Sequence, residues 1–101
     1  MATHVIHSAW KVDFNLSLLS YEGHIASTVN FLEFALSFLH KPHFLFTSSV
    51  SVASGWNSRE GAVPETILDN PTRLVEHGSG YAESKYVVEH VSHPVFLENF
   101  T

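Results

Sequence analysis

The sequence predicts an α/β fold built from a strand, a helix, a second strand, a long loop and a final helix. Two short apolar runs, at residues 4–10 and 43–47, flank a segment whose apolar residues recur with helical spacing. Strands that alternate with helices are typical of a parallel sheet joined by crossover connections. Because a parallel sheet is covered on both faces, two strands are too few to complete one, and we expect further strands beside them.

The first predicted strand is the mostly apolar run from His4 to Trp10, which is too short for a helix and fits a buried strand that opens into a loop. From about Ser20 to Leu39, apolar residues recur at steps of three and four, which predicts a helix with one apolar face. Ser20 is suited to cap the start of this helix, and Lys41–Pro42 closes it. Three phenylalanines widen the apolar face, so we expect the helix to be covered on more than one side.

The second predicted strand, His43–Thr47, leads into a hydroxyl-rich segment at 48–53. The connection at 54–80 carries four of the five glycines of the chain and has little periodicity, which predicts a long loop. Loops of this length in compact domains are usually functional lids or binding loops. A last helix is predicted from about Tyr81 to Val91, ended by Pro94, and the tail at 94–101 has no predicted role.

The composition excludes several classes of function. Lys and Arg total 5 and Asp and Glu total 10, so the net charge of −5 argues against a nucleic-acid partner and an anionic membrane surface. The absence of cysteine excludes disulfides, a thiolate nucleophile and a cysteine-ligated zinc site. The 101 residues allow one domain, and they show no signal peptide or bilayer-length apolar stretch, so we expect a soluble, cytoplasmic protein.

The strongest chemical signal is the pair Tyr81 and Lys85 on the last predicted helix. Residues four apart project from one face of a helix, so the two side chains should lie together. A nearby cation favours the phenolate and lowers the pKa of a phenol, which suits a tyrosine to general acid or base catalysis near neutrality. The same spacing is also common by chance, in an ordinary amphipathic helix with an exposed lysine.

Two weaker signals follow the predicted strands. Hydroxyl side chains cluster at 47–51 after the second strand, and small residues follow the first strand within His7–Trp10. In open α/β sheets ligands bind at the carboxyl ends of strands, where a serine can donate a hydrogen bond to a carbonyl oxygen. A serine-rich turn that satisfies its own backbone is the alternative. The three histidine pairs spaced three residues apart predict no metal site, because two ligands make a weak one.

Taken together, these segments resemble the extended short-chain dehydrogenase/reductase superfamily. The matching phrases are HVIHSAWKVDF at 4–14, FLFTSSVSVA at 44–53 and GYAESKY at 80–86. More narrowly, the Trp-Lys-Val-Asp-Phe continuation is similar to the thioester reductase domains that end fungal nonribosomal-peptide-synthetase-like and carboxylic acid (aminoadipate) reductases. The resemblance runs from about Thr3 to Val91 and implies a Rossmann-type NAD(P)-binding fold.

The resemblance implies a role for each matching residue. Tyr81 matches the proton donor to the substrate carbonyl, and Lys85 matches the residue that holds the nicotinamide ribose and lowers the pKa of that tyrosine. Ser49 matches the serine or threonine that hydrogen-bonds the carbonyl, with Ser48 as the alternative because the alignment is uncertain by one residue. The other residues implied to bind the cofactor follow the first strand: His7, Ser8 and Ala9.

By the same resemblance, the reaction is the NADPH-dependent reduction of a carrier-bound thioester to an aldehyde or an alcohol. The partner is then the acyl or peptidyl carrier of the parent enzyme. The long connection between Ser49 and Tyr81 would help to frame an acyl pocket, with Trp56 as its largest apolar member. The acyl substrate and the choice between NADPH and NADH stay open.

The sequence also departs from the family pattern. It contains no Gly-x-x-Gly-x-x-Gly turn, the element that holds the cofactor pyrophosphate at the start of the first helix. The chain therefore looks like an internal fragment that begins at the family's fourth strand and ends in an unmatched tail. We expect no activity from the chain alone. The alternatives are an inactive truncated product and an interaction piece that self-associates through an exposed sheet edge.

Overall fold

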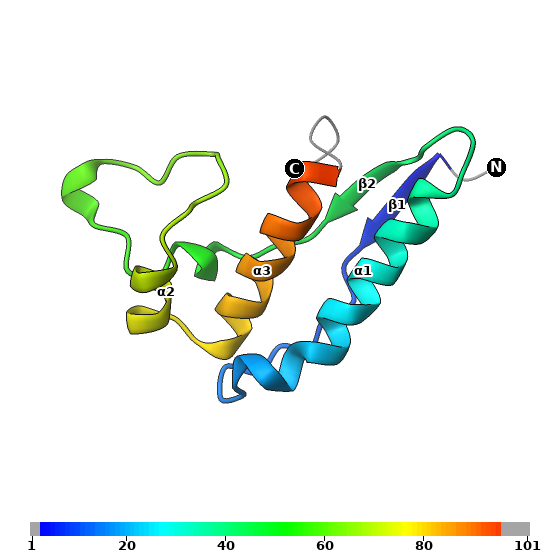
Figure 1. Ribbon diagram of the computed structural model, residues 1–101. Coiled ribbons are helices and arrows are strands. Elements are labelled where there is room, and N and C mark those ends of the chain that lie inside the picture. Colours follow the sequence, from blue (N-terminus) through cyan, green and yellow to red (C-terminus); the bar gives the residue numbers. More distant parts are fainter. Residues whose placement is uncertain (1–2, 96–101) are drawn as a thin grey trace.

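The computed structural model describes residues 3–95 and shows a small parallel sheet with helices beside it (Figure 1). The two strands are β1 (His4–His7) and β2 (His43–Phe46), and the three α-helices are α1 (Glu22–Leu36), α2 (Pro71–His77) and α3 (Gly80–Val95). Short 3-10 turns lie at Leu18–Tyr21, Val50–Ala53 and Ser58–Glu60. This mixed helix and parallel-sheet arrangement is consistent with the predicted α/β class.

The sheet pairs β1 with β2 in parallel, in a register that sets His4 beside His43 and His7 beside Phe46. One further backbone hydrogen bond extends the pairing at its carboxyl end, from the Thr47 N–H to the His7 carbonyl, at 3.0 Å. The helix α1 connects the two strands, as the alternation of the sequence predicts. The carboxyl ends of both strands therefore lie side by side, so the segments that follow them are neighbours.

The core lies where α1, β2 and α3 meet. Its buried members are Leu32, Ala35, Phe44, Phe46 and Val88, with Val5, Trp10 and Ile25 packed against them. The prediction that the first strand is buried is wrong for Ile6, which is 68% exposed, because no described element covers that side of β1. The outer side of α1 is likewise open, with Phe34 60% exposed, although the sequence predicts cover on more than one side.

The helix α1 begins two residues later than predicted, because residues 18–21 form a 3-10 turn that ends in Tyr21. The Tyr21 side chain is fully buried, and its hydroxyl donates to the Asp13 carbonyl at 2.7 Å. The Asp13 N–H donates back to that hydroxyl at 3.3 Å. These two bonds tie the loop after β1 to the start of α1, so the loop that carries Trp10 is fixed in place.

The predicted loop at 54–80 contains a helix that the sequence analysis missed. The helix α2 begins at Pro71, and the Asn70 side chain accepts a hydrogen bond from the Arg73 N–H at 3.2 Å. An asparagine cap followed by proline is a normal helix start, but seven residues are too few to show an apolar stripe. The connection projects from the side of α3 away from the strands (Figure 1).

The C-terminal end of helix α3 also differs from the prediction. It runs to Val95, one residue past Pro94, so the prediction that this proline ends the helix before it is wrong. The missing N–H of a proline removes one hydrogen bond, which the final turn of a helix tolerates better than its middle. The rest of the predicted tail, residues 96–101, lies outside the described part of the chain.

The first residue of α3, Gly80, sits directly against the backbone of the 3-10 turn. A Cβ atom added to Gly80 would overlap the Leu16 carbonyl oxygen and the Ser17 carbonyl carbon, and would lie 2.6 Å from the Leu18 nitrogen. These neighbours are main-chain atoms, which cannot rotate away as a side chain can. The close approach sets the position of Tyr81, the next residue of the helix.

We expect Gly80→Ala to lower the free energy of unfolding by about 2 kcal/mol or more, because the methyl group has no space against the backbone. Urea denaturation followed by far-ultraviolet circular dichroism measures this change. Gly23→Ala is the matched control, since nothing lies within 4 Å of a Cβ at that position in α1. The control should change stability by at most about 1 kcal/mol, in the stabilising direction. Equal stability of the two variants would contradict the close packing of Gly80.

Candidate nucleotide and substrate site

The side chains of Tyr81 and Lys85 lie together on one face of α3, as their spacing predicts. The Lys85 nitrogen is 5.8 Å from the centroid of the Tyr81 ring, and both residues are buried, at 8% and 2% exposure. The Lys85 ammonium crosses to the end of β2, where it donates a hydrogen bond to the Thr47 carbonyl at 2.7 Å. Lys85 is therefore not the exposed lysine of an ordinary amphipathic helix, which was the alternative explanation of this spacing.

Two aromatic rings line the Lys85 ammonium. Its nitrogen lies 4.7 Å from the centroid of the Trp10 ring and 4.7 Å from that of the Phe46 ring. Ring faces carry partial negative charge and attract a cation at this distance. An ammonium group has three N–H donors. Since one of them is given to Thr47, the other two are available to a ligand.

Burial lowers the pKa of Lys85 to about 8 from an ordinary 10.5, because water that would stabilise the charged form is excluded. The Glu89 carboxylate, one helical turn further along α3, acts in the opposite direction and raises that pKa. The pKa of Glu89 is itself raised by burial, against the lowering effects of the Ser48 hydroxyl, His90 and Lys85. Sequence analysis missed Glu89, although its position four residues after Lys85 was a usable signal.

Tyr81 packs edge-on against two aromatic rings, with centroid separations of 5.0 Å to Phe14 and 6.2 Å to Tyr21. Phe14 belongs to the loop after β1, and Tyr21 holds that loop through Asp13. The Tyr81 carbonyl accepts a hydrogen bond from the Ser84 hydroxyl at 2.6 Å, and the Trp10 indole N–H donates to that hydroxyl at 3.1 Å. The loop after β1 is therefore joined to α3 by both ring packing and hydrogen bonds.

The two serines after β2 have different surroundings. The Ser49 hydroxyl oxygen accepts hydrogen bonds from the Ser51 N–H at 3.1 Å and from the Ser51 hydroxyl at 2.9 Å. Its own O–H hydrogen remains free to be donated. The Ser48 hydroxyl is instead buried beside the Glu89 carboxyl, with no well-formed hydrogen bond among the described residues. The geometry thus offers Ser49, and not Ser48, as a donor to an outside ligand.

Of the three residues implied after β1, only His7 is buried, and Ser8 and Ala9 are exposed. The His7 Nε2 atom lies 2.8 Å from the Thr28 hydroxyl oxygen on α1. Burial is the largest cause of a lowered pKa for His7, and the charges of Lys85 and His24 add to it. The histidine is therefore a neutral, buried neighbour of Lys85.

A hollow of about 270 Å³ lies among the long connection, α2 and the outer side of α3. Its lining includes Val52, Ala53, Trp56, Leu68, Asp69 and Tyr86.

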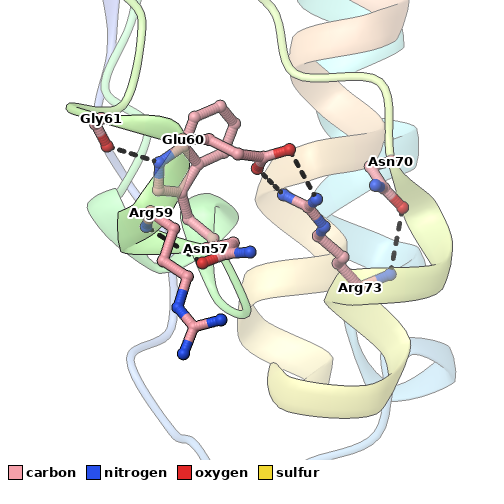
Figure 2. A network of polar contacts seen from close by, with 7 residues as sticks. Asn57, Arg59, Glu60, Gly61, Asn70 and Arg73 are labelled. Carbon is pink, nitrogen blue, oxygen red and sulfur yellow. Dashed lines mark hydrogen bonds and ion pairs between the residues drawn. The ribbon is translucent and has the colours of Figure 1, made fainter.

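Figure 2 shows how Arg73 reaches from α2 to Glu60, with two hydrogen bonds of 2.9 and 3.2 Å. This contact holds the pKa of Glu60 below its ordinary value. The Arg73 guanidinium also lies 5.6 Å from the Trp56 ring centroid. Neither Tyr81 nor Lys85 lines this hollow.

The described part of the chain holds neither a cluster of metal-ligating side chains nor a helix that could span a membrane. No three histidine, aspartate or glutamate side chains lie close enough together to hold a metal ion between residues 3 and 95. Within the same residues, no helix is long and apolar enough to cross a membrane.

A parallel strand–helix–strand unit whose carboxyl edge meets a buried Tyr–Lys pair belongs to the class of NAD-binding α/β domains. Comparison with known proteins agrees. Residues 1–96 match a family model of NAD-binding domains described as male sterility protein. The chain therefore belongs to this family of NAD-binding domains.

Its relatives include reductases and polyketide synthases. The adenylate-forming reductase Nps11 of Serpula lacrymans is 46% identical over 89 residues, which cover 86% of this chain and 8% of that protein. The carboxylic acid reductase of Neurospora crassa is 34% identical over 83 residues, which cover 82% of this chain and 8% of the reductase. The non-reducing polyketide synthase pkiA of Emericella nidulans is 28% identical over 96 residues, which cover 90% of this chain and 4% of the synthase. The resemblance to carboxylic acid reductases is confirmed, and the chain spans less than a tenth of each relative's length.

The family implies a nicotinamide cofactor, and the described residues fit one part of it. Lys85 has two unused N–H donors beside aromatic rings, which suits the hydroxyl groups of a ribose. The pyrophosphate is held in such folds by a glycine-rich turn, and the sequence contains none. The chain therefore offers groups for the nicotinamide ribose and none of the usual ones for the pyrophosphate.

The low pKa of Lys85 predicts how stability changes with pH. Between pH 8 and 10 the unfolded chain keeps the lysine proton while the folded chain loses it, so the free energy of unfolding rises with pH. The raised pKa of Tyr86 has the opposite effect, which becomes appreciable only as the pH approaches the ordinary value of 10. Lys85→Met should remove the rise, because methionine has no proton to lose.

Urea denaturation at several pH values between 8 and 10 measures this effect. Lys11→Met, at an exposed position, is the control and should keep the rise of the parent chain. A parent chain whose stability does not change with pH in this range would show that folding does not lower the pKa of Lys85.

Proposed function

We propose that the chain is the central and catalytic segment of a thioester reductase domain, which reduces a carrier-bound thioester to an aldehyde or an alcohol with NADPH. The observation that carries the proposal is the buried Lys85 ammonium, which lies 5.8 Å from the Tyr81 ring with two N–H donors unused. A buried cation is costly unless it has partners, so its retention beside a tyrosine favours a chemical role. The names of the relatives, adenylate-forming and carboxylic acid reductases, support the same reaction class.

A reduced nicotinamide held beside Lys85 would supply a hydride to the carbonyl carbon of the thioester. The Tyr81 hydroxyl donates the proton that the carbonyl oxygen or the departing sulfur needs, and Lys85 stabilises the phenolate left behind. The carbon–sulfur bond breaks, so the products are an aldehyde, a thiol and the oxidised cofactor. A second hydride and proton convert the aldehyde to an alcohol.

Ser49 is the residue we assign to the substrate carbonyl. Its oxygen accepts two hydrogen bonds from Ser51, which leaves its hydrogen to be donated to an outside oxygen. Such a donor stabilises negative charge that develops on the carbonyl during hydride addition. The burial of the Ser48 hydroxyl beside Glu89 supports Ser49 over Ser48.

We assign the acyl group of the substrate to the long connection. The hollow of about 270 Å³ beside Trp56 is lined by both apolar and polar side chains, as ligand pockets usually are. The Arg73–Glu60 contact holds its wall together. The carrier that presents the thioester would then approach from the side of the connection.

The finer description of the fold that we propose is a partial Rossmann domain without its glycine-rich N-terminal unit. Such a segment would bind NADPH weakly and would not turn over substrate alone. The alternative is an inactive product or a piece that self-associates through its sheet. The exposure of Ile6, at 68%, and of Phe34, at 60%, is the observation that favours self-association.

Calorimetric titration of the purified chain with NADPH tests the proposal. We expect saturable binding that Lys85→Met weakens about tenfold, which corresponds to the loss of a charge-assisted hydrogen bond. Tyr81→Phe should change the affinity by less than about twofold, because we assign its hydroxyl to proton transfer.

Arg59→Gln is the matched control for the loss of one positive charge, since Arg59 is exposed and lies outside the site. A folded chain that binds no NADPH would refute the proposed function. Sedimentation of the same sample distinguishes the proposed function from the self-association alternative. A self-associating piece would form oligomers at micromolar concentration, and nucleotide would have no effect on them.

A further inference from the structure

The Thr28 hydroxyl contacts both the His24 carbonyl and the buried His7 ring, and these two contacts together determine the tautomer of His7. Thr28 is 1% exposed and projects from α1 toward β1. Its hydroxyl donates to the His24 carbonyl one turn earlier in the helix, at 2.9 Å. The same oxygen lies 2.8 Å from the Nε2 atom of His7.

These two contacts determine which nitrogen of His7 carries the hydrogen. A hydroxyl has a single hydrogen, and Thr28 gives it to the His24 carbonyl, which can only accept. Toward His7 the hydroxyl oxygen must therefore be the acceptor, so Nε2 is the protonated nitrogen. In a neutral ring the other nitrogen, Nδ1, then carries a lone pair.

The surroundings keep that ring neutral and fixed. His7 is 8% exposed and packs among aromatic rings, with centroid separations of 5.3 Å to Phe31 and 5.9 Å to Phe46. The titratable groups that act on it are Lys85 and His24, and both lower its pKa, as does burial. A second proton on Nδ1 is therefore disfavoured, and the lone pair persists at neutral pH.

His7 itself lies at the edge of the sheet that we assign to the nucleotide. His7 ends β1, beside the exposed Ser8 and Ala9, and the charge of Lys85 reaches it. Nδ1 makes no hydrogen bond with the described residues. A ribose hydroxyl is both acceptor and donor, so it can accept from Lys85 and donate to Nδ1 at once.

We propose that Thr28 is a positioning residue of the nucleotide site, which holds His7 in its Nε2–H form so that Nδ1 accepts a hydrogen bond from a ribose hydroxyl of the bound cofactor. The inference rests on the proposed function for the identity of the ligand. The tautomer of His7 does not rest on it, because that follows from the contacts of the free chain.

The test compares Thr28→Val, which keeps the shape and removes the hydroxyl, with Thr28→Ser, which keeps the hydroxyl. Nitrogen-15 spectra of the imidazole in the free chain report the tautomer directly. We expect a protonated Nε2 in the parent chain, a mixture of tautomers in Thr28→Val, and the parent spectrum again in Thr28→Ser. Thr72→Val, at an exposed position of α2, is the control and should leave the His7 signals unchanged.

Titration of the same samples with NADPH gives the second readout. Thr28→Val should weaken NADPH binding about tenfold, because the ribose hydroxyl would lose its hydrogen bond to a correctly oriented Nδ1 of His7. Thr28→Ser should restore most of the affinity. Urea denaturation confirms that each variant is folded. A purely structural role for Thr28 would change stability while leaving both the tautomer and the affinity of the folded protein unaltered.

Each outcome decides one claim. A protonated Nδ1 in the parent chain would overturn the inference, whatever the affinity. An altered tautomer with unchanged NADPH affinity, when Lys85→Met does weaken binding, would overturn the positioning role and leave the proposed function intact. A parent chain with the expected tautomer that binds no NADPH would overturn the role of Nδ1 together with the proposed function.

Discussion

The hydrogen bond from the Lys85 ammonium to the Thr47 carbonyl is the contact on which the rest of the site depends. An ammonium at 2% exposure loses most of its water, and an unpaired charge there would be strongly destabilising. One carbonyl and two ring faces replace that water, and they come from the end of β2 and from the loop after β1. Retaining the charge therefore requires α3, β2 and that loop to meet at one point, which is also where a ligand of the sheet would bind.

The loop after β1 can meet this requirement because it is held at several points. Tyr21 pairs with both polar backbone groups of Asp13, and the Trp10 indole bonds to Ser84 on α3. The contact of Gly80 with the backbone at 16–18 brings the start of α3 as close as main-chain atoms allow. These contacts are buried or partly buried, whereas the arginine pair across the long connection is solvent-exposed and contributes little to stability. The proposed nucleotide side of the site is thus held by more buried contacts than the proposed acyl side.

Periodicity in the sequence predicted the elements whose apolar faces are long enough to show it. The strands, α1 and α3 followed from alternation and helical spacing, and the common face of Tyr81 and Lys85 followed from four-residue spacing. The helix α2 was missed because seven residues show no stripe, although Asn70–Pro71 is a helix-start signal. The exposure of Ile6 and the pairing of Thr28 with His7 could not be predicted, because both depend on which segments distant in sequence pack together.

The choice between Ser48 and Ser49, which sequence matching leaves open, shows how tertiary contacts distinguish two consecutive residues. Residues that follow one another in extended backbone point to opposite sides, so one of two consecutive serines after β2 must face α3. Ser48 faces it, and its hydroxyl is enclosed with the Glu89 carboxyl, one turn from Lys85. Ser49 is therefore left to the other side, where its oxygen is held by Ser51 and its hydrogen is unused. An alignment error of one residue would exchange the proposed substrate donor for a buried neighbour of the lysine, and the different surroundings of the two hydroxyls favour Ser49 for that proposed role.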